Sequence, residues 1–315
     1  MTIDVVRTAD GWWIERDGHA IGIETAATTT AELLADRAAV EKAAENAGAS
    51  AGTRPIAELA HESPVTAPCR VVAQMVNYRS HAKDSGFDPD RVSPTFFRKS
   101  SASISGPTDP IVKPAHVRLL DYEVELGLVL GAAVPIGTVV TEATLAEYVA
   151  GLVVANDVSA RDVQLTKGQF YESKSYPTFT PVGPRLTLLE PEDFPHLINL
   201  RLRLAVNGVP RQDRTLADMI VGPARALTLL ARFQTLAPGD LLLTGTPGGT
   251  ALKAPPKIVE KIGALLPPER KWRTFFARQE ANPRYLKPGD VVTASIATPD
   301  GRIDLGCQHT TVTAP

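Results

Sequence analysis

The sequence predicts an α+β protein that is rich in β-strands, and three observations carry this prediction. Apolar or alternating runs separated by Pro- and Gly-rich turns dominate the chain after Val71. Helical patterns are fewer there, and a hairpin pattern with an Ala- and Glu-rich helical run precedes them. We therefore expect a small N-terminal α/β module over residues 1–68 and one larger domain over residues 69–315, in a chain of 315 residues that can bury a sizeable core.

The expected elements follow in chain order. A hairpin is expected over Gly11–Ile23 and a helix over Thr30–Asn46, before a Gly/Ser/Ala-rich piece at Ala47–Thr53. The larger domain is expected to hold strands at Val71–Val76, Leu119–Leu130, Leu152–Ala155, Ile198–Val206, Leu241–Leu243 and Val291–Ile296. Its expected helices are Glu142–Val149 and Leu216–Leu236, the second interrupted by Gly222-Pro223.

Composition narrows the class of partner and compartment. A net charge of −2 without a Lys/Arg-rich run gives no electrostatic footprint for nucleic acid or an anionic membrane, so a small-molecule partner is expected. Two cysteines, Cys69 and Cys307, form no disulfide framework. The N-terminus lacks a signal-peptide pattern, and no apolar run reaches the length of a membrane span. These features predict a cytoplasmic protein.

The most informative motif is Asp121-Tyr-Glu-Val-Glu-Leu-Gly127. On a strand Glu123 and Glu125 point to the same face, and Asp157 ends a later apolar run. Most such glutamate pairs are solvated, but these lie among leucines and valines, where buried carboxylates need a cation, hydrogen bonds or a proton. The three carboxylates are therefore predicted to bind one hard divalent cation such as Mg²⁺.

Motifs along Val71–Val312 together resemble the fumarylacetoacetate hydrolase family. The resemblance is carried by the order and spacing of Asn77–His81, Pro94–Lys99, Asp121–Glu125, Asn156–Asp162, Lys174–Tyr176, Pro181–Pro184, Val206–Gly208, Thr244–Pro247 and Leu286–Asp290. It implies a mixed β-sandwich roll and a homodimer. It also implies Mg²⁺ or Mn²⁺ held by Glu123, Glu125 and Asp157.

The resemblance places a catalytic pair at His81 and Asp84. His-x-x-Asp brings both side chains to one face of a helix, and a carboxylate would orient the imidazole as a general base. A solvated surface helix is the alternative. The family more often has Glu at the position of Asp84, so the reach of this shorter side chain to His81 is in question.

Five further residues complete the expected site. Lys174 is expected to be catalytic and Lys99 to bind substrate, each by placing a positive charge near a carboxylate or enolate, although surface lysines are the alternative for both. Arg161 and Gln164 suit the holding of a substrate carboxylate, with an ion pair between Arg161 and Asp162 as the alternative. Thr246 lies in a Gly/Pro turn that either aims a hydroxyl at an oxyanion or is only a turn.

These parts suit hydrolysis of a carbon–carbon bond in a β-diketo acid such as an acylpyruvate, with His81 and Asp84 activating water. Decarboxylation, isomerisation or hydration of 2-oxo acids is the alternative in the same family. A non-catalytic paralogue that binds metal and ligand is the third possibility.

Two departures from the family pattern bear on the substrate. Pro177 stands where many relatives have aspartate, which stiffens the turn and removes a polar contact. Residues 254–284 are an insertion with Trp272, Phe275 and Phe276, expected to be a helical lid, a dimer contact or surface decoration.

Overall fold

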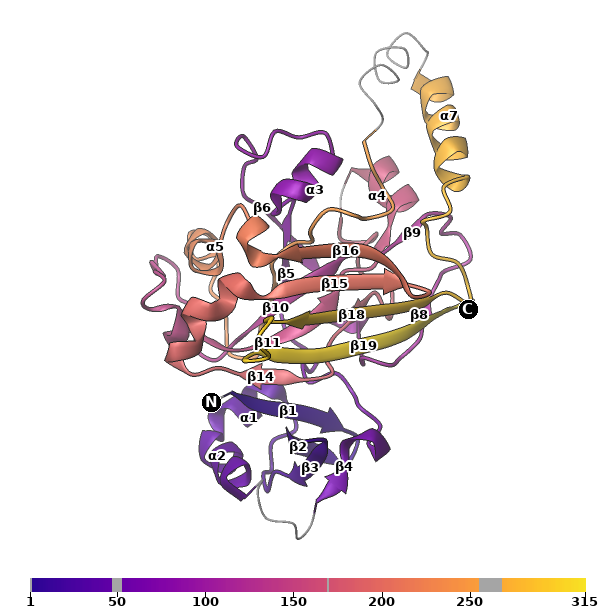
Figure 1. Cartoon of the computed structure of the whole chain (residues 1–315). Coiled ribbons are helices and arrows are strands. Elements are labelled where there is room, and N and C mark those ends of the chain that lie inside the picture. Colours follow the sequence, from indigo (N-terminus) through magenta and orange to yellow (C-terminus); the bar gives the residue numbers. More distant parts are fainter. Residues whose placement is uncertain (1, 47–52, 169, 255–267) are drawn as a thin grey trace.

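The computed structural model describes residues 2–46, 53–168, 170–254 and 268–315 (Figure 1). Most of the Gly/Ser/Ala-rich piece, at residues 47–52, and residues 255–267 of the insertion lie outside the described residues. Its strands are β1 Ile3–Thr8, β2 Gly11–Arg16, β3 His19–Gly22, β4 Arg54–Pro55, β5 Val71–Met75, β6 Thr95–Lys99, β7 Ile104–Ser105, β8 Ile111–Val112, β9 Leu120–Asp121, β10 Val124–Leu130, β11 Val149–Asn156, β12 Ser159–Ala160, β13 Thr180–Pro181, β14 Leu186–Leu188, β15 Arg201–Val206, β16 Val209–Thr215, β17 Leu241–Leu243, β18 Val291–Ala297 and β19 Asp304–Thr313.

Helices are fewer and short, as the sequence predicts. The α-helices are α1 Thr30–Ala35, α2 Arg37–Asn46, α3 Arg79–Asp84, α4 Arg161–Lys167, α5 Pro223–Leu230 and α7 Pro268–Glu280. The 3₁₀ helices are η1 Ile56–Glu58, η2 Ser101–Ser103, η3 Leu145–Glu147, η4 Pro191–Asn199 and η5 Leu216–Asp218.

The largest sheet of the described structure is mixed and has ten strands, in the order β4-β3-β2-β1-β14-β11-β10-β17-β5-β6. Strand β10 is buried along its whole length between β11 and β17, because both of its faces meet core side chains. Strands β17 and β5 pair in parallel, whereas β5 and β6 pair antiparallel. The polar groups at the ends of β10 and β11 therefore lie deep in the fold.

A second sheet, in the order β16-β15-β18-β19-β8, packs over the first (Figure 1). Leu126 and Leu128 of β10 share one core cluster with Leu202 of β15 and Ile296 of β18. The two layers form the expected mixed β-sandwich, so the predicted strand-rich α+β class is confirmed.

The first strands of the chain extend the large sheet. Residues Ile3 to Val5 of β1 pair antiparallel with Leu186 to Leu188 of β14, and the predicted hairpin is formed by β2 and β3. The apolar side chains of this segment, Trp12 and Leu33 among them, share a core cluster with Val153 and Leu241 of the large sheet. Residues 1–68 and the rest of the chain are therefore joined by both hydrogen bonds and core packing in the described structure.

Several expected elements are wrong in type or length. The helix expected over Glu142–Val149 is only η3, because Val149 pairs with Leu130 and begins β11. The helix expected over Leu216–Leu236 is reduced to η5 and α5, since Pro223 stands at the first helical position and starts a new helix. Ile198 belongs to η4 rather than to β15, and the helix over Thr30–Asn46 is divided between α1 and α2.

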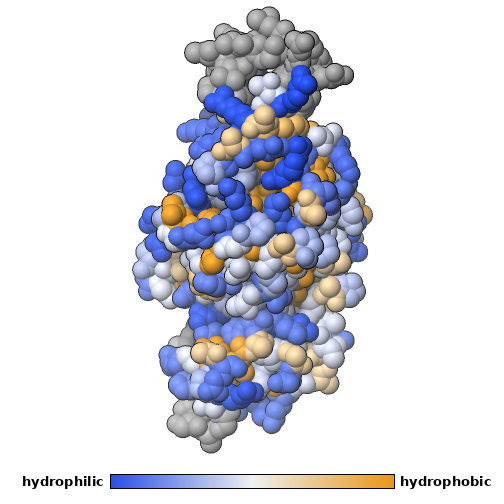
Figure 2. Space-filling model, turned by 90° about the vertical axis from the view of Figure 1, so that its right-hand side faces the viewer, coloured by the Kyte–Doolittle hydropathy of each residue, from blue (hydrophilic) through white to orange (hydrophobic). Residues whose placement is uncertain are grey.

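Figure 2 shows the surface of one side of the molecule. The face in Figure 2 is mainly hydrophilic, with small separate apolar areas. Among the described residues, no helix is both long and apolar enough to span a bilayer.

Candidate metal and acid–base site

Three carboxylates meet where β10 and β11 lie side by side. Glu123 precedes β10, Glu125 lies within it, and Asp157 follows β11; one oxygen from each lies within 4.8 Å of the others. The backbone fixes this arrangement, because the Asp157 N–H donates to the Glu123 carbonyl at 2.8 Å and the Glu123 N–H donates to Asn156 Oδ1 at 3.0 Å. The prediction that Glu123 and Glu125 share a face with Asp157 nearby is confirmed. Metal binding by them stays a prediction.

Two buried lysines contact these carboxylates. Lys174 Nζ donates to Glu123 Oε2 and to Asp157 Oδ2, both at 2.6 Å, and Lys99 Nζ pairs with Asp157 Oδ1. Lys99 also donates to the Phe179 carbonyl at 3.0 Å. Both lysines expected at the site are therefore there, and the surface alternative is wrong for each.

The charges around the carboxylates are unevenly distributed. Burial opposes the charge of Glu123, but the cations of Lys174 and Arg161 outweigh it and hold the pKa of Glu123 below its usual value. Burial and the nearby charges of Asp157 and Glu123 raise the pKa of Glu125 well above its usual value. Among the described residues Glu125 has no ion pair, and its Oε2 accepts only the Gly245 N–H, at 2.8 Å.

This donor set fits a hard divalent cation. The oxygens converge, they are buried, and the Lys174 ammonium already lies between Glu123 and Asp157, so these two residues can hold a cation between them. Glu125 has no cation of the described residues beside it, and its raised pKa favours the protonated form, so a second positive group is what would favour its carboxylate. Glu123, Glu125 and Asp157 are therefore the residues that would bind Mg²⁺ or Mn²⁺.

Arg161 forms ion pairs with Asp121 and Glu123 and not with Asp162. Its Nε donates to Asp121 Oδ2 at 2.8 Å, its Nη2 pairs with Glu123, and its Nη1 donates to Gln164 Oε1 at 2.9 Å. The guanidinium is buried, and the charges of Glu123 and Asp121 overcome this burial and raise its pKa. The alternative ion pair of Arg161 with Asp162 is wrong, because Asp162 accepts backbone N–H groups. Both side chains already have hydrogen-bond partners within the protein. Substrate binding by Arg161 and Gln164 therefore remains a proposal.

His81 and Asp84 lie on α3 as the spacing predicts, but no hydrogen bond joins them among the described residues. Asp84 Oδ2 instead accepts the Gly249 N–H at 3.0 Å, and the carboxylate pairs with Lys253 at 3.3 Å. The imidazole is half-buried, its Nδ1 is buried without a hydrogen-bond partner in the described structure, and desolvation lowers the pKa of His81 against the opposing charge of Glu123. This shift favours the neutral form of the ring, which lies within electrostatic reach of Glu123. The expected orientation of His81 by Asp84 is wrong for this conformation.

A strained turn carries α3 over the site. Val76 has a φ of 53°, a left-handed conformation that a β-branched residue rarely adopts. Asn77 fixes this turn, because its Nδ2 donates to the carbonyls of Val221 at 3.0 Å and Thr244 at 2.8 Å, and its Oδ1 accepts the Val221 N–H. Strain of this kind persists where the surrounding structure imposes it, commonly at functional sites.

Thr246 supports the turn beside β10. Its hydroxyl donates to the Val124 carbonyl at 2.9 Å and accepts from Gln212 Nε2 at 2.8 Å. Gly245 has a φ of 85°, which suits glycine, and this conformation directs its N–H at Glu125. The hydroxyl is buried and both its donor and its acceptor functions are used within the protein, so the structure favours a structural role for Thr246 in the turn. Substrate binding by Thr246 remains a proposal.

The described part of the insertion forms α7, which docks onto the body of the protein. Arg118 Nη1 donates to Glu280 Oε1 at 2.7 Å, and its guanidinium lies 5.4 Å from the centre of the Phe276 ring. Tyr285 Oη donates to Gln279 Oε1 at 2.9 Å. The helix is therefore attached on the side of the molecule where the chain enters β9.

Asp121 and Gln212 are the supporting residues that sequence reasoning missed. Asp121 accepts Arg161 Nε and the N–H groups of Ala251 and Leu252, at 2.8 Å and 3.1 Å. Asp121 stands two residues before Glu123 in the same motif, and this position could have indicated its role in the site. Nothing in the sequence pointed to Gln212, because it lies on β16 and its partner Thr246 is far away along the chain.

The chain thus combines a strand-rich β-sandwich, a buried centre of three carboxylates and a neighbouring helix that carries a histidine. The model of the fumarylacetoacetate (FAA) hydrolase C-terminal domain matches residues 70–313, and the chain belongs to that family.

The relatives are enzymes with several activities. The chain is 35% identical over 210 residues to the mitochondrial oxaloacetate tautomerase Fahd2a of Rattus norvegicus, a match covering 66% of this chain and 65% of the relative. It is 35% identical over 231 residues to a 2,4-didehydro-3-deoxy-L-rhamnonate hydrolase of Sphingomonas sp. (strain SKA58), covering 72% and 79%. The solved structure of a probable 2-hydroxyhepta-2,4-diene-1,7-dioate isomerase from Mycobacterium abscessus superposes with a TM-score of 0.74 at 29% identity, over 100% and 99% of the two chains.

Proposed function

We propose that this chain is a divalent-cation-dependent enzyme that moves a proton at the carbon beside the keto group of a 2-oxo acid, with keto–enol tautomerisation as its leading reaction. The observation that carries the proposal is a half-buried His81, whose buried Nδ1 has no hydrogen-bond partner among the described residues, beside three buried carboxylates. Tautomerisation needs one group that accepts and returns a proton. The tautomerase and isomerase activities named for two relatives support the same choice.

The residues of the chain divide the work as follows. Glu123, Glu125 and Asp157 would hold Mg²⁺ or Mn²⁺, which when bound polarises a substrate oxygen and stabilises the negative charge that develops on it. His81 accepts at Nδ1 the proton that leaves the substrate carbon, and the imidazolium so formed returns it to the substrate oxygen. Lys174 supplies positive charge that stays with the centre through its contacts with Glu123 and Asp157.

Hydrolysis of a carbon–carbon bond in an acylpyruvate is the second candidate. Its support is the position of Asp84 on the same helix as His81 and the hydrolase named among the relatives. In the described conformation Asp84 is engaged by Gly249 and Lys253, so this reaction requires Asp84 to leave them and orient His81. Catalytic hydrogen bonds of this kind often form only with substrate bound.

One assay separates the two reactions. The enol absorbance of oxaloacetate and of acetylpyruvate is followed with Mg²⁺, with Mn²⁺ and with EDTA, and products are identified by mass. We expect metal-dependent equilibration of the oxaloacetate enol with no loss of carbon, abolished in Glu125→Gln and in His81→Asn but retained in Asp84→Asn. Cleavage of acetylpyruvate that is lost in Asp84→Asn would establish the hydrolase instead. Ligand-dependent stabilisation without either reaction would identify a non-catalytic binding protein.

The assembly and the metal are proposed on the family resemblance. We expect a homodimer, which light scattering measures directly, and we expect Mg²⁺ and Mn²⁺ both to raise the melting temperature of wild type but not of Glu125→Gln.

A further inference from the structure

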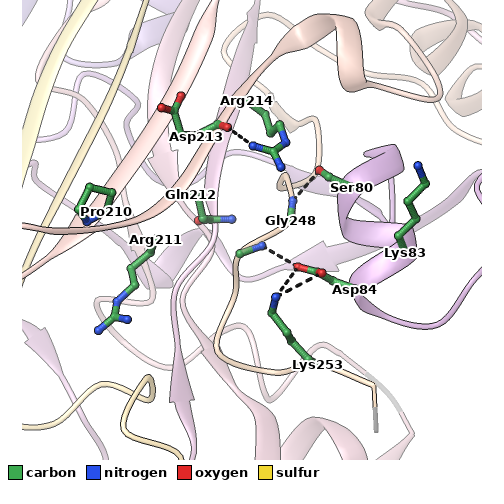
Figure 3. Close-up of a pocket in the computed structure, with 11 residues that line it drawn as sticks. Ser80, Lys83, Asp84, Pro210, Arg211, Gln212, Asp213, Arg214, Gly248 and Lys253 are labelled. Atoms are coloured by element: carbon green, nitrogen blue, oxygen red, sulfur yellow. Dashed lines mark hydrogen bonds and ion pairs between the residues drawn. The ribbon is translucent and has the colours of Figure 1, made fainter. Parts of the chain in front are cut away.

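A cavity outside the three-carboxylate centre lies between α3, strand β16 and the segment from Gly248 to Lys253 (Figure 3). Its volume is about 370 Å³. Figure 3 shows Arg211 and Arg214 of β16 on one side, α3 on the other, and Gly248 and Lys253 between them.

The cavity is lined by more positive than negative side chains. Among the described residues that line it, the cations are Lys83, Arg211, Arg214 and Lys253 and the carboxylates are Asp84 and Asp213. Both carboxylates are already engaged: Asp84 by Lys253 and the Gly249 N–H, and Asp213 by Arg201, whose Nη2 donates to it at 2.8 Å.

Of these four cations only Lys253 forms an ion pair within the described structure, while Arg214 Nη1 donates to the Asp213 carbonyl at 2.7 Å. Arg211 forms no ion pair within the described structure, and its Nε is buried without a hydrogen-bond acceptor. Lys83 likewise forms no ion pair with a described residue. A buried guanidinium N–H without an acceptor is costly, and a planar guanidinium binds carboxylate or phosphate oxygens in pairs.

We propose that this cavity binds an anionic group, a carboxylate or a phosphate, with Arg211 as its principal ligand and Lys83 adding positive charge from the α3 wall. The group comes either from the substrate, as a second carboxylate distant from the keto group, or from a separate small anion. The first source rests on the proposed function, whereas anion binding itself does not.

The position of the cavity connects it to the acid–base site. Ser80 Oγ on α3 accepts the Gly248 N–H at 2.9 Å, and the Asp84 carbonyl accepts the Ala254 N–H at 2.9 Å. On the opposite wall Gln212, next to Arg211, accepts the Val124 N–H at 3.0 Å. An anion held by Arg211 and Lys83 would thus join the strand that supports β10 to the helix that carries His81.

The test is anion binding to purified protein in EDTA, so that a metal cannot recruit the carboxylate. Melting temperature is measured against malonate and against inorganic phosphate, with chloride holding the ionic strength constant, for wild type, Arg211→Gln, Lys83→Gln and Arg232→Gln. Arg232 is the matched control because it is exposed, forms no ion pair with a described residue and lies outside the cavity lining.

We expect malonate or phosphate to stabilise wild type and Arg232→Gln equally. Loss of one charge-assisted pair weakens binding by about tenfold or more, so Arg211→Gln should need that much more anion for the same shift. Lys83→Gln should weaken binding in the same direction, and it serves as the second variant if Arg211→Gln is unfolded. Equal responses of Arg211→Gln, Lys83→Gln and Arg232→Gln, or no response of wild type beyond chloride, would overturn the proposal.

The source of the anion is decided by kinetics. If the substrate supplies it, Arg211→Gln raises KM for a dicarboxylic 2-oxo acid but not for a monocarboxylic one, and malonate competes with the dicarboxylic substrate. If a separate anion supplies it, malonate binds without competing. Should the protein turn over neither substrate, the proposed function fails while the melting experiment still decides anion binding.

Discussion

Replacing Lys174 by methionine removes the ammonium that lies between two buried carboxylates. Lys174 Nζ contacts Glu123 and Asp157 at 2.6 Å each, and all three side chains are buried. Removing one partner of a buried ionic cluster leaves uncompensated charge, at a cost of about 3–5 kcal/mol. For a chain of this size that corresponds to a fall of roughly 6–10 °C in melting temperature. We expect this fall in EDTA and a larger recovery on adding Mg²⁺ or Mn²⁺ than wild type shows.

The matched control is Lys167→Met, which breaks an exposed ion pair with Glu172 in the same part of the chain. The two side chains are 50% and 39% exposed, so breaking the pair should change the melting temperature little. The assay is thermal unfolding by circular dichroism with and without metal. If Lys174→Met in EDTA unfolds at the same temperature as Lys167→Met, the ammonium does not balance the carboxylates and the reasoning is refuted.

Three further predictions test other parts of the structure. Glu125→Gln removes a charge that burial and neighbouring carboxylates disfavour, so in EDTA it should melt no lower than wild type yet gain nothing from Mn²⁺ in calorimetric titration; a lower melting point would contradict this. Asp121→Asn leaves buried Arg161 with less compensation and should cost about 3 kcal/mol in urea unfolding while weakening metal binding; an unchanged metal affinity would show that Asp121 does not position Glu123. Burial raises the pKa of Cys69 to about 12, so in Cys307→Ser the folded protein should resist iodoacetamide at about pH 8, where thiolate is absent, and react only as pH approaches that value. Rapid alkylation detected by intact mass would contradict that last prediction.

Strand alternation was enough to predict the centre of the site from sequence. The spacing of Glu123 and Glu125 determines their common face whatever the rest of the fold does, and their apolar neighbours indicate burial. The helical spacing of His81 and Asp84 was also right. Their contact was not, because the Gly249 N–H and Lys253 compete for Asp84, and both reach it from far along the chain.

Elements decided by distant pairing were not predictable. The segment before Val149 reads as helix, but pairing with Leu130 draws Val149 into β11, and tertiary contacts override weak propensity. In the same way, the pairing of β1 with β14 joins residues such as Val5 and Leu186, which no local pattern connects. For Arg161 the sequence offered an ion pair with its neighbour Asp162 only as the alternative to substrate binding, whereas Asp121 and Glu123 approach it from far along the chain.

The charge balance of the centre explains how the fold keeps these carboxylates buried. Asp157 is paired with both lysines, and Glu123 is paired with Lys174 and Arg161. Glu125 alone of the three has no cation among the described residues and receives only a backbone N–H. The protein's own cations therefore stabilise two ligands in advance and leave the third unbalanced. Because burial and the neighbouring carboxylates favour the protonated form of Glu125, a divalent cation that binds here is expected to displace that proton.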